Sequence, residues 1–135
     1  MPHIVNDKDP GKERRLLCRA VVVAIRYFSH QKEHNTDSHD LIVFIILSLE
    51  TVIKTVDRTV FAWEKRDYWM KADRFRLEWS WVELYSKELR IAYSSQNWRS
   101  IEEIIANIGK KLVGVKVSEN NRIGTPWKGF KDHFK

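Results

Sequence analysis

The sequence predicts an all-α protein, an antiparallel four-helix bundle that ends in an irregular basic tail. Three observations support this fold class. No glycine or proline lies between Gly11 and Gly109, so the turns that a β-rich domain needs have no residues to form them. Apolar residues recur at spacings of three and four through most of that span. Apolar residues make up 43% of the 135-residue chain and charged residues 31%, which is typical of one globular domain.

The first helix is expected over residues 12–33, after the start signal formed by residues 9–11. Its apolar positions fall on one face at helical spacing. They are Leu17, Val21, Ala24 and Phe28. A second face carries Arg15, Arg19, Arg26 and His30, which predicts a basic stripe.

The second helix is expected to start near Ser38, with Asp37 or Ser38 as its N-cap, and to end at a break near residues 64–67. Residues 41–47 are apolar on every side, so this segment must be buried all round. The β-branched residues here and in residues 21–23 leave a strand as the alternative for both segments.

The third helix is expected over residues 67–93, because its apolar residues alternate spacings of three and four. This seam comprises Ala72, Phe75, Trp79, Val82, Ser86, Leu89 and Tyr93. Further apolar residues are expected to widen the same buried face, namely Leu77, Trp81, Leu84 and Ile91. After a break at residues 94–97, the fourth helix is expected over residues 98–112.

Residues 1–112 are therefore predicted to form the helical bundle, and residues 113–135 an extended tail docked on it. The charge is unevenly divided between them. Residues 1–109 carry 17 Lys or Arg and 16 Asp or Glu, whereas residues 110–135 carry seven and two, so most of the net charge of +6 lies in the last helical residues and the tail taken together. Such asymmetry can indicate an anionic partner.

Nucleic-acid binding is one functional hypothesis from this charge pattern. The tail interleaves Trp127, Phe130 and Phe134 with Lys128 and Lys131. Lysines suit phosphates and aromatic rings suit stacking on bases. Three arginines of the first helix would extend this surface, namely Arg15, Arg19 and Arg26. The alternative is that the three aromatic residues of the tail pack back on the bundle.

A metal-dependent hydrolase is the second alternative. Residues 30–34 match the pattern H-x-x-E-H, in which two histidines four residues apart on a helix can hold Zn²⁺ and the glutamate can act as a base. The candidate ligands are His30, Glu33, His34, Asp37 and His39, with Asp40 following them. The pattern sits at an expected helix end, so a plain helix end and the cap of the next helix explain the same residues. No nucleotide-binding glycine loop and no G-x-S-x-G elbow is present in the sequence.

The single cysteine, Cys18, excludes a disulfide within this chain and favours a reducing compartment, so we expect a cytoplasmic protein. Residues 1–7 lack the features of a signal peptide, and the apolar run 41–47 is too short to span a bilayer, so no membrane partner is expected. Neighbouring arginines could activate the thiol, but its apolar neighbours favour a buried and inert one.

The favoured hypothesis is a non-enzymatic protein without a cofactor, which acts by binding other proteins. Residues 21–23 and 41–47 carry more apolar surface than a small bundle easily covers. A homodimer would bury this surface through one self-complementary patch. The sequence therefore predicts that the chain binds itself or another protein, with nucleic acid as a further partner to test.

Overall fold

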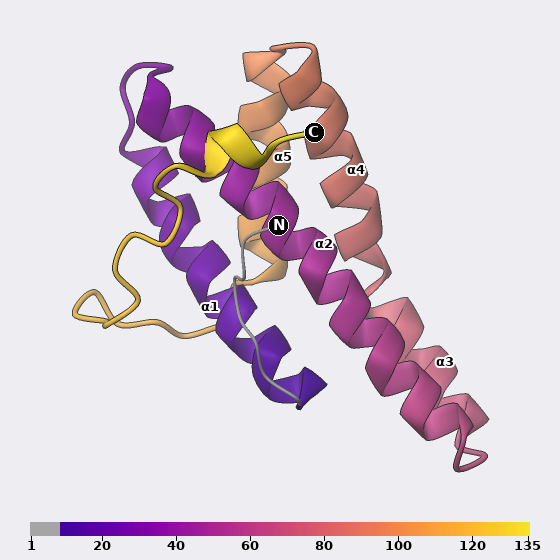
Figure 1. Ribbon diagram of the computed structural model, residues 1–135. Helices are drawn as coiled ribbons and strands as arrows, with labels where there is room; N and C mark the ends of the chain where they lie inside the picture. Colours follow the sequence, from indigo (N-terminus) through magenta and orange to yellow (C-terminus); the bar gives the residue numbers. More distant parts are fainter. Residues whose placement is uncertain (1–8) are drawn as a thin grey trace.

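The computed structural model describes residues 9–135, and the secondary structure of these residues is entirely helical (Figure 1). This confirms the all-α class, and both segments for which a strand was the alternative lie inside helices. The elements are α1 (Pro10–Ser29), α2 (Thr36–Glu64), α3 (Trp69–Glu78), α4 (Ser80–Ser94), α5 (Trp98–Lys111) and the 3₁₀ helix η1 (Phe130–His133). The expectation about residues 1–7 lies outside the described residues.

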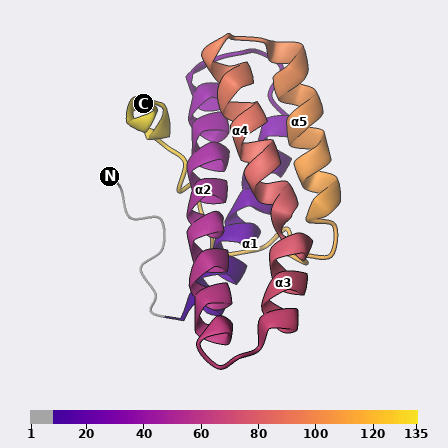
Figure 2. The same ribbon diagram turned by 90° about the vertical axis from the view of Figure 1, so that its right-hand side faces the viewer.

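Helix α2 is the central element, since it contacts α1, α3, α4 and η1 (Figures 1 and 2). Helices α3 and α4 follow one another along α2, and α5 packs on α4. Each of the longer connections reverses the direction of the chain, as Figure 1 shows. No helix of residues 9–135 is long and apolar enough to cross a membrane.

The structure starts α1 at Pro10, two residues before the predicted start, and α5 at Trp98 as predicted, and both helices carry a side-chain N-cap. The carboxylate of Asp9 accepts the backbone N–H of Gly11 at 2.9 Å, and the side chain of Asn97 accepts that of Ser100 at 3.3 Å. The start of α2 differs from the prediction. Its N-cap is Asn35, whose side-chain oxygen accepts the N–H of Ser38 at 3.1 Å, rather than Asp37 or Ser38.

The predicted helix 67–93 is divided at Trp79, which has φ −102° and ψ 6°. The hydroxyl of Ser80 donates to the carbonyl of Leu77 at 2.8 Å, so a side-chain hydrogen bond accompanies the break. Hydrophobic periodicity continues across this single residue, which explains why the sequence pattern did not show the bend. Counting α3 and α4 as one bent helix leaves four helical segments in the predicted order.

The apolar segment 41–47 is buried within a single chain, with no residue more than 2% exposed. Part of its cover comes from the tail. The ring of Phe44 lies 4.9 Å from that of Phe130 and 6.2 Å from that of Trp127, both edge-on. Residues 41–47, the longer of the two segments that motivated the homodimer prediction, are therefore covered without a second copy.

Two polar anchors hold the tail beside these aromatic contacts. The buried carboxylate of Asp40 accepts the backbone N–H groups of Gly129 and Lys131, at 3.0 and 2.9 Å. The guanidinium of Arg26 donates to the carbonyls of Val117 and Ser118. The positive φ of Gly129, 80°, lets the chain turn into η1 directly above Asp40.

Candidate binding surfaces

The H-x-x-E-H residues do not share a helix face, because α1 ends at Ser29 and not at Glu33. His30 is the C-cap residue of α1, and its backbone N–H bonds to the carbonyl of Tyr27 at 3.2 Å. His34 lies in the loop, where its ring stacks on Trp98 with the centroids 3.7 Å apart and the planes at 4°. The premise of two histidines one helical turn apart is therefore wrong.

Two of the remaining candidate metal ligands make structural contacts, and a third is exposed to solvent. The His39 Nδ1 atom lies 2.8 Å from the hydroxyl oxygen of Tyr93, and Asp40 holds the tail. Burial lowers the pKa of His39, and the nearby Lys131 lowers it further. Asp37 is exposed in the first turn of α2. Within residues 9–135 no three His, Cys, Asp or Glu side chains gather as metal ligands. The hydrolase hypothesis remains a prediction.

The nucleic-acid candidates fall into two groups. Trp127 is only 3% exposed, and its ring packs against those of Tyr27 and Phe44, so it presents no face for a base. Arg26 is engaged by the carbonyls of the tail. The exposed members are Arg15, Arg19, Lys128 and Lys131. The structure therefore separates the predicted stacking residue from the predicted phosphate ligands, and nucleic-acid binding remains a prediction.

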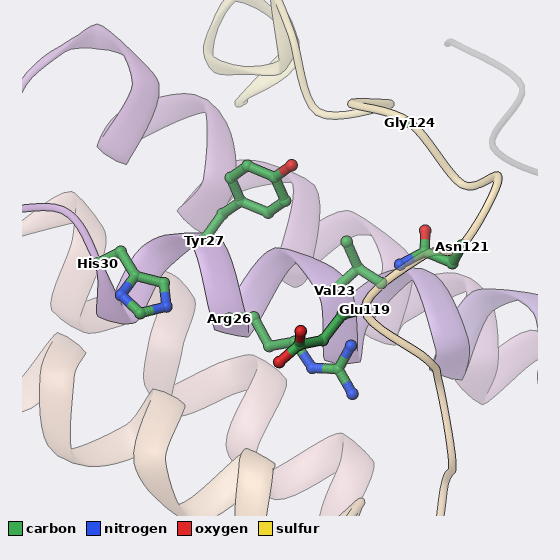
Figure 3. A pocket seen from close by; sticks show the side chains of 7 residues that line it. All are labelled: Val23, Arg26, Tyr27, His30, Glu119, Asn121 and Gly124. Carbon is green, nitrogen blue, oxygen red and sulfur yellow. The ribbon is translucent and has the colours of Figure 1, made fainter.

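A pocket of about 530 Å³ opens between α1 and the tail (Figure 3). Tyr27 and His30 line it from α1, and Asn121 and Gly124 line it from the tail. Both charge signs are present, since Arg26 and Glu119 also face it. Because Arg26 already holds carbonyls of the tail, we assign this pocket to the docking of the tail and not to a ligand.

A second cavity, of about 330 Å³, lies between α1, Trp79 and the start of the tail. Its lining combines apolar side chains with several cations, namely Arg14, Arg15, Cys18, Arg19, Trp79, Val115 and Lys116. Burial raises the pKa of the Cys18 thiol to about 11, so the thiol is neutral and unreactive near neutral pH. Sequence reasoning missed this cavity because its walls come from three distant segments.

The outer side of α3 and α4 carries an apolar stripe that the sequence assigned to the core. Met70, Leu77, Leu84 and Ile91 are 73%, 73%, 55% and 68% exposed. Met70 and Leu77 lie on α3, and Leu84 and Ile91 lie on α4. Their spacing of seven residues places each pair on the side of its helix opposite the buried seam. The expectation that Leu77, Leu84 and Ile91 widen the buried face is thus wrong. We call these four residues the outer stripe. The two helices that carry it, α3 and α4, follow one another along α2 (Figure 2).

No family model, curated protein or solved structure matches this chain. The functional argument therefore rests on the surfaces described above.

Proposed function

We propose that this chain is a non-enzymatic helical-bundle protein that acts through protein–protein contact, and that its first partner is a second copy of itself, bound through the outer stripe. In this proposal the four helical segments form one antiparallel bundle, with α3 and α4 as a single bent helix. The compartment is the cytoplasm, which the single buried cysteine supports.

The observation that carries the proposal is the exposure of four large apolar side chains at seven-residue spacing. Each Å² of apolar surface removed from water contributes about 25 cal/mol, so covering the outer stripe would stabilise a complex by several kcal/mol. Residues seven apart stay close to one face of a helix, so a second helix can pack along them. The occupant that fits it best is therefore a helix of similar length.

The sequence of the stripe is complementary to itself in the antiparallel direction. A two-fold axis between Ser80 and Trp81 would set Met70 opposite Ile91 of the second copy, and Leu77 opposite Leu84 of the second copy. The same axis would bring the two Trp81 rings together, which adds aromatic area at the centre of the contact. Antiparallel helix dipoles attract one another, which also favours this direction.

The charges beside the stripe fit the same arrangement. On one flank, Arg74 would face Glu88 of the second copy. On the other flank, Asp73 would face Lys87 of the second copy. Arg74 and Glu88 form no ion pair with any residue of 9–135, so both are free to pair across the contact. This matching supports a second copy over an unrelated helix.

The test is the molar mass by light scattering over a dilution series. We expect a dimer that dissociates on dilution, and a monomer at every concentration for Leu77→Glu. The matched control is Leu16→Glu, because Leu16 is also an exposed leucine, 42% exposed, but lies on α1. A wild-type chain that stays at the monomer mass of 16.1 kDa throughout the series would overturn the proposal.

A further inference from the structure

We infer that the cavity between α1, Trp79 and the start of the tail is a binding site for a small apolar carboxylate. The inference is independent of self-association, since it rests on this cavity alone. Its volume of about 330 Å³ is at the lower end of the range for small-molecule sites.

The interior of the cavity suits the apolar body of such a ligand. Cys18, Trp79 and Val115 supply its apolar walls. Cys18 is 3% exposed, and because burial keeps its thiol protonated, this residue adds no charge to the wall. These walls offer almost no hydrogen bonds to the edge of a nucleobase, which favours an aliphatic or plain aromatic body.

The rim of the cavity suits a carboxylate. Arg15, Arg19 and Lys116 lie at it, all three are exposed, and no acidic side chain lines the cavity. None of the three forms an ion pair with a residue of 9–135, so their charge is uncompensated there. Guanidinium groups bind carboxylates through paired, charge-assisted hydrogen bonds.

A fourth cation fixes the wall of the cavity. The guanidinium of Arg14 donates to the hydroxyls of Thr55 and Thr59, at 3.4 and 3.2 Å. It also lies over the rings of Phe75 and Trp79, 4.7 and 5.5 Å from their centroids. Arg14 therefore helps to hold the Trp79 ring in place, and because these contacts engage Arg14, the other three cations are the ones left for the ligand.

The experiment uses octanoate as the probe and the indole N–H signal of Trp79 as the readout, in ¹⁵N-labelled full-length protein. The signal is assigned with Trp79→Phe. We expect octanoate to shift the signal in a saturable way at millimolar concentration. Octanol, which has the same apolar body without the charge, should bind at least about tenfold more weakly, as expected for the loss of charge-assisted hydrogen bonds.

Two variants test the two halves of the site. Arg15→Ala/Arg19→Ala should weaken octanoate binding about tenfold or more, and Val115→Trp should abolish it by filling the cavity. The control is Arg99→Ala, because the Arg99 side chain is 91% exposed and lies at the start of α5. Equal binding of octanol and octanoate, no shift at all, or unchanged binding in the double-arginine variant would each overturn the site. A short oligonucleotide that displaces octanoate at equal concentration would overturn the assignment of ligand class.

Discussion

The carboxylate of Asp40, near the start of α2, accepts the backbone N–H of Lys131 at 2.9 Å, although 91 residues separate the two in sequence. Asp40 is 5% exposed and also accepts the N–H of Gly129. The 3₁₀ turn of the tail thus presents its N–H groups to a buried negative charge. This contact places Trp127 and Phe130 over Phe44 and completes the cover of the apolar segment 41–47.

Replacing Asp40 by asparagine should loosen the tail. Asparagine keeps the shape but has one acceptor oxygen in place of two, so one backbone N–H would face an amide NH₂ group. We expect the free energy of unfolding to fall by roughly 1–3 kcal/mol, measured by urea unfolding. Asp37→Asn is the matched control, since Asp37 is exposed in the same first turns of α2. Equal effects of the two variants would contradict the anchoring role.

Replacing either of two phenylalanines of α2 by alanine should have very different effects on the free energy of unfolding. Phe44 is fully buried and touches the tail aromatics, whereas Phe61 is 58% exposed. Phe44→Ala should lower the free energy of unfolding by about 3–5 kcal/mol, and Phe61→Ala by less than about 0.5 kcal/mol. Chemical denaturation measures both. A small effect at Phe44 would show that the tail does not cover this part of the core.

The stability of the fold should depend on His39 at mildly acidic pH. Burial, then the nearby Lys131, lowers the pKa of His39 below its ordinary value of 6.5. As the pH falls below 6.5, the unfolded chain gains the proton first, so the free energy of unfolding decreases until the folded pKa is passed. Above 6.5 the full stability is present.

His39→Gln should therefore show a smaller loss of stability than the wild type between about pH 7.5 and pH 5. The urea midpoint at a series of pH values provides the measurement. The other histidines are common to both proteins and cancel in the comparison. An unchanged pH profile in the variant would show that His39 titrates alike in the folded and unfolded chains.

Reversing single charges beside the outer stripe should break and then restore the proposed dimer. Arg74→Glu would set two glutamates together twice in an antiparallel pair, and Glu88→Arg two arginines, so each variant alone should be monomeric. An equimolar mixture should form a heterodimer, because every facing pair is again of opposite sign. Light scattering and native mass spectrometry measure this.

The mixing experiment also reports the direction of the contact. In a parallel pair, Arg74 would face Asp73 of the second copy instead. Mixing the two variants would then not strengthen their association beyond that of the separate variants. Monomers that stay monomeric on mixing would thus contradict the antiparallel register, even if the wild type dimerises.

The sequence by itself determined the helical class and most helix positions, because these follow from local information. The absence of glycine and proline between Gly11 and Gly109 argues against the tight turns of a β-rich domain, and the caps at Asp9 and Asn97 depend on near neighbours. The breaks near residues 64–67 and 94–97 could also be predicted, because they depend on local polar residues. The structure ends α2 at Glu64 and α4 at Ser94. The need to bury residues 41–47 also followed from their composition alone.

Only the tertiary structure decided what covers each apolar face. The helix over residues 69–94 has two apolar lines of similar period, one through Val82 and Leu89 and one through Leu77 and Leu84, and periodicity cannot say which one meets α2. Which of the two lines is buried depends on side chains from distant segments of the chain. The same is true of the cover of Phe44 by Phe130. The end of α1 at Ser29, four residues before the predicted end, likewise leaves His34 outside the helix, in the loop before the Asn35 cap of α2. The burial of a side chain depends on the segment that packs against it, and the local sequence around the side chain does not identify that segment.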